Sequence, residues 1–172
     1  IHSWDELEWI DGAREAVARL TEDGWLLFVA TNQSGVARGY YTESDVQLLH
    51  EQMNSSFREL GGNITKFFYC PHLPGAPVKK YDVVCDCRKP APGMIIRAIN
   101  EYNLPKDQVF LFGDSDRDIK AAEAAGIKGF LFDGTNLKDF VYQKLAGLGY
   151  RDNGKEAVSY THLRAHETLA NL

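Results

Sequence analysis

Short apolar runs that each end in small or acidic residues alternate with helical patterns along this chain. Three of the runs are WLLFVATN at 25–32, QVFLFGD at 108–114 and KGFLFDG at 128–134. A continuous apolar run of this length is typical of a strand buried on both faces of a parallel sheet. Parallel strands need crossover connections, and helical patterns lie between these runs. The alternation predicts an α/β fold with a doubly wound parallel sheet and helices on both faces.

The intervals between the runs carry the expected helical periodicity. Thr42 can cap a helix that runs to about Leu60 and stops at a Gly-Gly pair. Further helices are expected at 12–20, at 93–102 and from 114 to Gly126, and ITKFFYC at 64–70 is expected as a strand. Ligands of such sheets bind at the carboxyl ends of the strands. Here those ends read ATNQSG, YCPH, GDSD and FDG.

Length and charge limit the function classes. A chain of 172 residues is one ordinary domain, and its formal net charge of −5 argues against a general nucleic-acid binder. No apolar run approaches the roughly 20 residues of a membrane span, so no membrane partner is expected. We assign residues 1–150 to the domain and 151–172 to an atypical tail outside the fold. His162 and His166 in that tail have helical i, i+4 spacing, but no third zinc ligand is near, and an exposed helix or disordered segment is the better interpretation.

Three cysteines and one histidine bracket a Pro-rich loop, which we call the Cys/His loop (residues 70–89). The order is Cys70, His72, Cys85 and Cys87. Three thiolates and one imidazole complete a closed tetrahedral set, as in structural zinc sites. The alternative is buried cysteines with an incidental histidine. Two paired ligand clusters at the ends of an otherwise unsupported loop favour zinc with a structural role.

Basic and hydroxyl side chains near these strand ends suit an anion. Arg88 and Lys89 directly follow the cysteines and could clamp a phosphate, or could form only a solvated charged patch. Thr31 and Asn32, with the backbone amides of their loop, could bind an oxyanion, although such residues also end strands for turn reasons. No P-loop or dinucleotide fingerprint is present.

GDSDRDIKAAEAAG at 113–126 places Asp114, Asp116 and Asp118 within five positions at a helix N-terminus. A strand that ends in acids at this point predicts a cation site. The stretch alone supplies too few carboxylates aimed at one point, so further ligands are needed.

In this order, TNQSGVARGYY, CPH…CDCRKPAPGM and GDSDRDIKAAEAAG resemble the haloacid dehalogenase superfamily over roughly residues 5–135. Within it they resemble the phosphatases of D-glycero-D-manno-heptose 1,7-bisphosphate, with the histidinol-phosphate phosphatases as near kin. SGVARGYY and KPAPGM favour the heptose branch. The resemblance implies a Rossmann-like fold and a cytoplasmic, monomeric Mg²⁺-dependent enzyme of lipopolysaccharide precursor synthesis. Its partner would be a small sugar phosphate, and its cofactors Mg²⁺ and Zn²⁺.

The resemblance also implies roles for individual residues. Thr31 and Lys89 would hold the transferring phosphoryl group, and Asp118 would support the Lys89 ammonium or the metal shell. Asp114 would bind Mg²⁺, and the cysteines and histidine of the Cys/His loop would bind Zn²⁺. The substrate contacts implied by the resemblance are Asn32, Arg38, Arg88 and Lys89.

Members of this superfamily carry a strand that ends in an Asp-x-Asp motif, whose first Asp is the nucleophile and whose second is the general acid–base. No such motif precedes Thr31, and Asp5 matches the approach to the family's first helix. We therefore expect that the first strand is missing and that the fragment is inactive, with a zinc-stabilised binding module as the alternative. The resemblance places that strand between those ending at Thr31 and Asp114. We expect either a gap there or direct pairing of the two neighbours.

Overall fold

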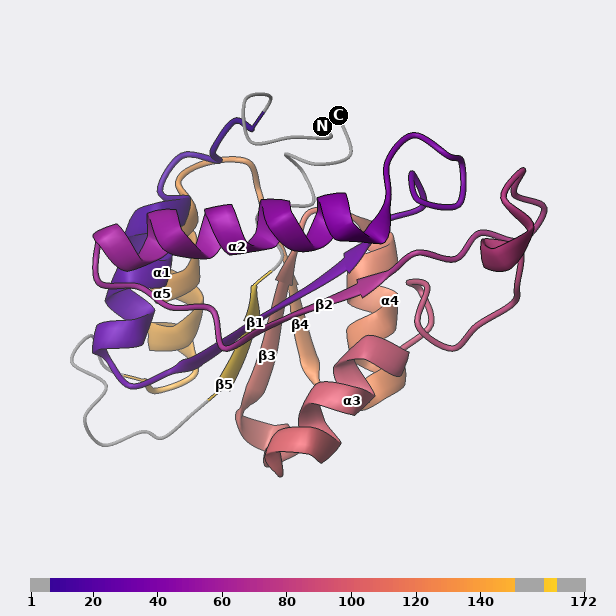
Figure 1. The fold of residues 1–172 in the computed structure, drawn as a ribbon. Helices are drawn as coiled ribbons and strands as arrows, with labels where there is room; N and C mark the ends of the chain where they lie inside the picture. Colours follow the sequence, from indigo (N-terminus) through magenta and orange to yellow (C-terminus); the bar gives the residue numbers. More distant parts are fainter. Residues whose placement is uncertain (1–6, 151–159, 164–172) are drawn as a thin grey trace.

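The computed structural model describes residues 7–150 and the backbone of 160–163. Its five-stranded parallel sheet has the strand order β2-β1-β5-β3-β4 (Figure 1). The strands are β1 (Leu26–Asn32), β2 (Lys66–Cys70), β3 (Val109–Gly113), β4 (Lys128–Leu131) and β5 (Tyr160–Leu163). The helices are α1 (Ala13–Glu22), α2 (Glu43–Glu59), α3 (Gly93–Tyr102), α4 (Asp116–Ala125) and α5 (Leu137–Gly147), with short 3₁₀ helices at Lys79–Tyr81 and Lys106–Gln108.

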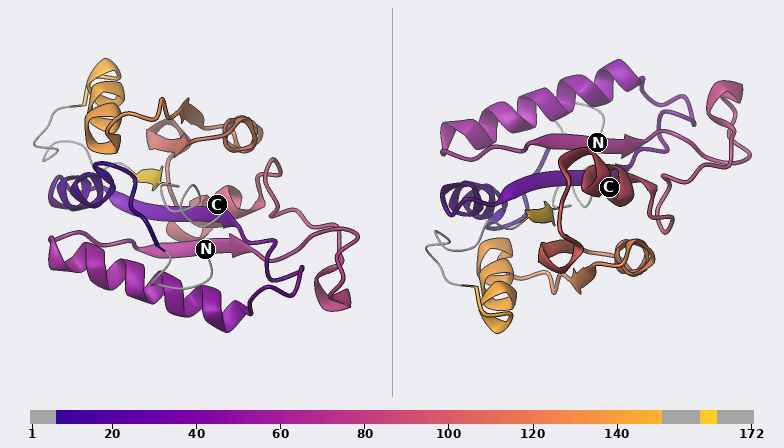
Figure 2. Two further views of the ribbon diagram at one scale, coloured as in Figure 1. Left: turned by 90° about the horizontal axis from the view of Figure 1, so that it is seen from above. Right: turned by 90° about the horizontal axis from the view of Figure 1, so that it is seen from below.

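The helices cover both faces of the sheet and enclose two apolar cores. Residues of α1, α2 and α5 pack with Leu27 and Val29 on one face. Residues of α3 and α4 pack with Phe28 and Ala30 on the other. Figure 2 shows the two groups of helices on either side of the strands. Successive residues of β1 thus enter opposite cores, which explains its unbroken apolar sequence. The predicted doubly wound fold is confirmed.

Helix α2 begins where the sequence predicts. The Thr42 hydroxyl accepts from the Asp45 N–H at 3.2 Å, and the Asp45 carboxylate accepts from the Thr42 N–H at 2.9 Å. This reciprocal pair satisfies two backbone N–H groups at the helix start. The capped start places Glu43 beside the Cys/His loop, where its carboxylate accepts a hydrogen bond from Tyr81.

The centre of the sheet differs from the prediction. Neither a gap nor direct β1–β3 pairing is present, because β5 pairs in parallel with both neighbours: Phe28 lies opposite His162, and Phe112 opposite Leu163. Residues 160–163 of the tail are therefore part of the sheet, and His162 lies on a strand rather than a helix. His166 is outside the described residues. The physical reason is that the facing edges of β1 and β3 carry backbone donors and acceptors that an intervening strand satisfies.

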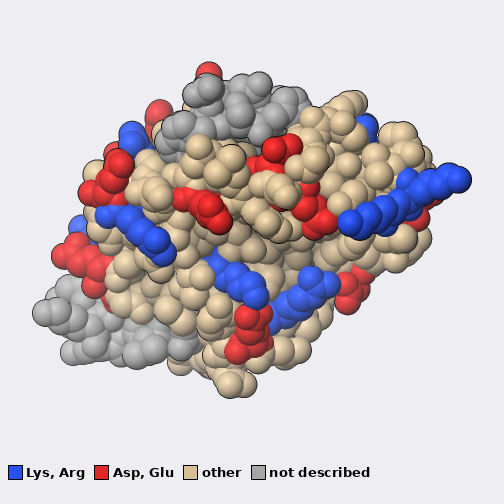
Figure 3. Space-filling view, in the orientation of Figure 1, with Lys and Arg blue, Asp and Glu red and all other residues tan. Residues whose placement is uncertain are grey.

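Helix α5 was not among the predicted elements. Its buried residues Leu137, Phe140, Val141 and Leu145 follow helical spacing. None of the described helices is both long and apolar enough to cross a membrane. On the face drawn in Figure 3, Lys and Arg side chains are interspersed with Asp and Glu side chains over the described surface.

Candidate active site

A buried ion pair lies at the carboxyl end of β1. The Lys89 ammonium is 3.2 Å from Asp118 Oδ1, and the two side chains are 1% and 0% exposed. Lys89 Nζ also donates to the carbonyl oxygen of Ala30 at 2.6 Å. A buried ammonium is stable only with such partners. The structure thus brings Lys89 and Asp118 together, as the sequence resemblance implies.

Asp118 is held by the start of helix α4. Its Oδ2 accepts from the backbone N–H groups of Asp114 and Ser115, each at 3.1 Å, and from the Ser115 hydroxyl at 3.1 Å. Gly113 makes this approach possible, because a Cβ at that position would lie 2.4 Å from Asp118 Cβ. The glycine that ends β3 therefore allows the carboxylate to fold back toward Lys89.

Thr31 and Asn32 lie beside Lys89, at the end of β1. Asn32 and Lys89 form a reciprocal pair, in which the Lys89 N–H donates to Asn32 Oδ1 at 2.9 Å and Asn32 Nδ2 donates to the Lys89 carbonyl at 3.2 Å. This pair fixes the backbone from which Lys89 projects. The Asn32 amide is used in holding Lys89, whereas the resemblance implies a substrate contact. Thr31 is fully buried, and its Oγ1 accepts from Gln33 Nε2 at 3.3 Å.

The four predicted metal ligands converge. Their candidate ligand atoms, the three Sγ atoms and an imidazole nitrogen of His72, all lie within 4.8 Å of one another. The Sγ atoms of Cys70 and Cys85 are 3.4 Å apart, and Cys87 Sγ is 3.4 Å from His72 Nδ1. Ligands at about 2.3 Å from a tetrahedral zinc ion are separated by roughly 3.8 Å. The cluster therefore fits one tetrahedral metal ion. Its ligands come from the end of β2 and from the far end of the Cys/His loop.

The thiols of this cluster differ in pKa. A hydrogen bond between Cys87 and Cys70, at 2.8 Å between their sulfur atoms, lowers the pKa of Cys87 to about 5 and raises that of Cys70. A thiolate is the form that binds metal. The shared proton in this arrangement would be displaced by a cation placed between the sulfur atoms.

The three carboxylates of the 113–126 stretch have separate environments. Asp118 is buried, whereas Asp116 pairs with Lys120 at 2.9 Å on the exposed face of α4. Asp114 lines a cavity of about 460 Å³ together with Asp11 and Asp133. Sequence reasoning did not select these last two. Asp133 could have been found, because it lies two residues after the end of β4 in the run KGFLFDG, but Asp11 precedes α1 and reaches the cavity only through the fold.

The two arginines differ in their surroundings. Arg88 is partly buried, and its Nη1 is buried without a hydrogen-bond partner among the described residues. Its guanidinium therefore keeps a donor for an anion. Arg38 is exposed on the loop after β1, and the structure does not place it against Lys89 or Thr31 by any described contact.

Glu43 joins helix α2 to the Cys/His loop. Its carboxylate accepts from the Tyr81 hydroxyl at 2.7 Å and from the Tyr69 hydroxyl at 2.9 Å. The bond to Tyr81 is the main cause of the lowered pKa of Glu43, and it raises the pKa of Tyr81 to about 12. The start of α2 thus holds the 3₁₀ turn of the loop from outside the cysteine cluster.

We expect Glu43→Gln to lower the pKa of Tyr81 from about 12 toward the ordinary value of 10. The amide removes the negative charge that opposes ionisation of the phenol. The measurement is an ultraviolet titration of each protein, with the Tyr81→Phe variant subtracted to isolate this tyrosine. An unchanged titration in the variant would show that the Glu43 contact is not formed in solution.

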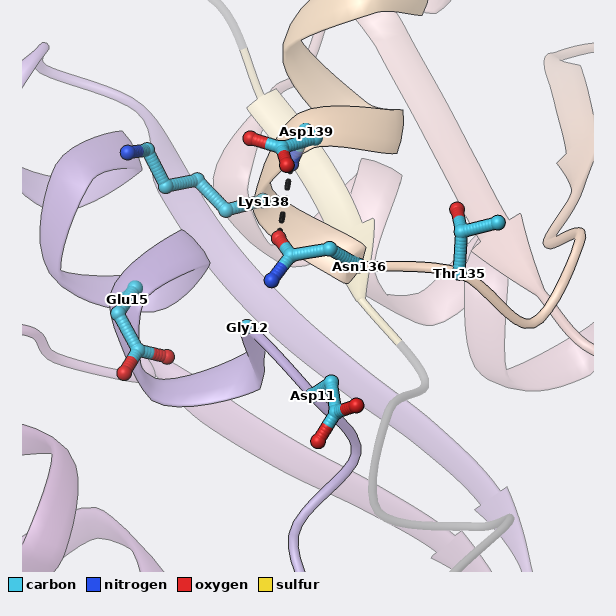
Figure 4. Close-up of a pocket in the computed structure, with 7 residues that line it drawn as sticks. All are labelled: Asp11, Gly12, Glu15, Thr135, Asn136, Lys138 and Asp139. Carbon is cyan, nitrogen blue, oxygen red and sulfur yellow. Dashed lines mark hydrogen bonds between the residues drawn. The ribbon is translucent and has the colours of Figure 1, made fainter.

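A second hollow lies between the N-termini of α1 and α5, with a volume of about 490 Å³ (Figure 4). Asp11, Glu15 and Asp139 line it with the single cation Lys138. The Asn136 side chain accepts from the Asp139 N–H at 3.2 Å and so caps α5. The surplus of carboxylates makes this hollow unsuited to a phosphate ester, and we do not assign it to the active site.

Comparison with known proteins agrees with this geometry. The HAD-hydrolase-like family profile matches residues 86–138. D-glycero-β-D-manno-heptose-1,7-bisphosphate 7-phosphatase of Rhodopseudomonas palustris is 40% identical over 141 residues, which cover 82% of this chain and 78% of that protein. The enzyme of the same name from Escherichia coli K12 is 36% identical over 157 residues, covering 86% and 82%.

Solved structures agree as well. A crystal structure of D,D-heptose 1,7-bisphosphate phosphatase from B. bronchiseptica, complexed with magnesium and phosphate, superposes with a TM-score of 0.70 at 31% identity. It covers 100% of this chain and 89% of its own. A putative HAD-like phosphatase from Mesorhizobium loti gives 0.65 at 29% identity, covering 71% and 59%. The chain belongs to the D-glycero-β-D-manno-heptose-1,7-bisphosphate 7-phosphatase family of haloacid dehalogenase-like hydrolases.

Proposed function

We propose that the protein containing this chain removes the phosphate at C7 of D-glycero-D-manno-heptose 1,7-bisphosphate. The observation that carries the proposal is the buried Lys89–Asp118 pair, which presents a fixed positive charge beside Thr31 at the carboxyl end of β1. Phosphoryl transfer is catalysed mainly by positioning and by charges placed against the phosphoryl oxygens. The names of the relatives support the choice of substrate.

Each residue then has a defined task. Lys89 and Thr31 donate to the non-bridging phosphoryl oxygens, and Asp118 keeps the Lys89 ammonium charged and oriented. Arg88, whose Nη1 has no described partner, binds the substrate from the end of the Cys/His loop. Arg38 and Asn32 are the further substrate contacts that we propose.

Two metal ions complete the proposal. Asp114 would hold Mg²⁺, and its neighbours Asp11 and Asp133 give the same cavity the carboxylate oxygens that a hard cation prefers. Mg²⁺ supplies charge neutralisation at the phosphoryl group when bound. Zn²⁺ on Cys70, His72, Cys85 and Cys87 would fix the Cys/His loop, because four protein ligands leave no open position for chemistry.

The nucleophile is the part that the printed chain does not supply. In the proposed reaction an aspartate carboxylate attacks phosphorus, the sugar oxygen leaves with a proton from a second aspartate, and water then hydrolyses the aspartyl phosphate. No Asp-x-Asp precedes Thr31 in this sequence. We therefore propose that the chain as printed binds phosphate but does not turn over. We further propose that the enzyme is cytoplasmic and monomeric.

The test compares two proteins: the chain of 172 residues, and the same chain extended at its N-terminus by an apolar strand ending in Asp-x-Asp. Phosphate release is measured from the heptose bisphosphate and from histidinol phosphate. We expect turnover only in the extended protein, with the heptose preferred, because loss of a nucleophile can cost about 10⁶ in kcat. Preference for histidinol phosphate would reassign the substrate. No turnover by either protein would support a binding module instead.

A further inference from the structure

We infer that Gln33 and Tyr41 are positioning residues that set the direction of the Thr31 hydroxyl, so that its proton points to a bound phosphoryl oxygen. The inference rests on the proposed function, in which Thr31 contacts the phosphoryl group. It adds two residues to which no role has been assigned above, and it follows from one directed series of hydrogen bonds.

The series of hydrogen bonds begins at the Tyr41 phenol, which contacts both Gln33 and the backbone of Gly35. The Tyr41 phenol oxygen is in a hydrogen bond with the backbone of Gly35, and a backbone N–H can only donate to it. The phenol proton is then directed to Gln33 Oε1, which lies 2.7 Å away. Burial raises the pKa of Tyr41, so the phenol keeps this proton at neutral pH.

The Gln33 amide links the Tyr41 phenol to the Thr31 hydroxyl. Because Oε1 accepts from Tyr41, Nε2 faces Thr31 and donates to its Oγ1 at 3.3 Å. An amide in the opposite orientation would place two donors against each other at Tyr41. Gln33 is 2% exposed, so water has little access to compete for these bonds.

The Thr31 hydroxyl oxygen therefore already accepts a hydrogen bond, from Gln33 Nε2. Its own proton has a described contact only with the Asn32 carbonyl oxygen, at a long 3.3 Å. A phosphoryl oxygen accepts a shorter and stronger bond from a hydroxyl, so a bound phosphate would draw this proton away from Asn32. If the Gln33 amide were reversed, the Thr31 hydroxyl would donate its proton to Gln33 Oε1 instead of to a phosphoryl oxygen.

The local backbone is shaped to hold the phenol in place. Gly35 packs directly against the Tyr41 ring, where a Cβ would lie 2.3 Å from a ring carbon. The Tyr40 N–H donates to the Gly35 carbonyl at 2.9 Å and closes the turn that returns Tyr41 to this position. The sequence QSGVARGYY thus folds so that its last residue orients its first.

The test measures the binding of inorganic phosphate to the zinc- and magnesium-loaded protein by isothermal titration calorimetry. The unchanged chain is compared with Tyr41→Phe, Thr31→Val and the double variant. A hydrogen bond to a charged group corresponds to about a tenfold change in Kd. We expect Thr31→Val to weaken binding about tenfold and Tyr41→Phe several-fold. In the Thr31→Val background, Tyr41→Phe should have no further effect.

The matched control is Tyr40→Phe, since Tyr40 is the adjacent tyrosine and is 65% exposed. It should leave the Kd unchanged. Gln33→Met, which keeps the side-chain length without a donor, should reproduce Tyr41→Phe and serves if that variant fails to fold. If Thr31→Val weakens binding while Tyr41→Phe and Gln33→Met do not, the positioning role is wrong and the proposed function stands. If Thr31→Val has no effect, the assigned role of Thr31 fails as well.

Discussion

Asp118→Asn should lower the free energy of unfolding by about 3–5 kcal/mol, because it leaves the buried Lys89 ammonium without its countercharge. For a domain of this size the melting temperature should fall by roughly 10 °C. Both partners of this pair are excluded from solvent, so no water replaces the lost carboxylate. The measurement is a urea or thermal unfolding curve of the variant against the unchanged chain.

The same helix provides the control. Asp116 pairs with Lys120 at 2.9 Å, but its side chain is 79% exposed. Asp116→Asn should therefore change stability by about 0–1 kcal/mol. Adding Lys89→Met to Asp118→Asn should recover part of the loss, since it removes the stranded charge. Equal melting of the Asp118→Asn and Asp116→Asn proteins would contradict the buried pair.

The second large effect concerns the Cys/His loop. We expect one tightly bound zinc ion per chain, and chelation should unfold the loop between residues 70 and 89. Structural zinc contributes on the order of 10–16 kcal/mol in zinc-finger peptides. Outside the cysteine cluster the described loop has one 3₁₀ turn, Lys79–Tyr81, which Glu43 holds through Tyr81, so most of the remaining loop should depend on the metal. Metal analysis and proteolysis of the chain, before and after chelation, measure both effects.

Cys87→Ser should abolish stoichiometric zinc and, through the displaced Lys89, weaken phosphate binding. His166→Ala is the matched control, because it removes a histidine that is not in the predicted ligand set. That variant should retain one zinc ion. Zinc near zero in the unchanged chain, with three freely reactive thiols, would refute the site.

The strand ends could be read from the sequence because their signal is local. An apolar run such as LLFVATN is buried on both faces and stops where polar residues begin, and this pattern alone located β1, β3 and β4. The spacing of Cys70, His72, Cys85 and Cys87 likewise identified a cluster that the fold does assemble. Helix α5 carries a comparable periodic signal in Leu137, Phe140, Val141 and Leu145, so this helix too can be predicted from local sequence.

Strand order, by contrast, cannot be predicted from the sequence of any single segment. Residues 151–172 were expected to lie outside the fold, yet Tyr160–Leu163 lie between β1 and β3. Local propensity does not predict that position. It results from the unsatisfied backbone groups on the facing edges of two strands that are distant in sequence.

The sequence by itself indicated the type of fold and the Cys/His cluster, which follow from hydrophobic period and from side-chain chemistry at fixed spacing. The proposed phosphoryl contacts Thr31 and Lys89 came from the family resemblance. Only the tertiary structure decided how such residues act on one another: that Asp118 contacts the Lys89 ammonium directly, which the resemblance left open, that Asn32 holds the Lys89 backbone, and that Tyr41 reaches Thr31 through Gln33. The reason is that hydrogen bonds and ion pairs depend on distance and direction in space. In this protein, crossover connections and a glycine at the end of β3 set both.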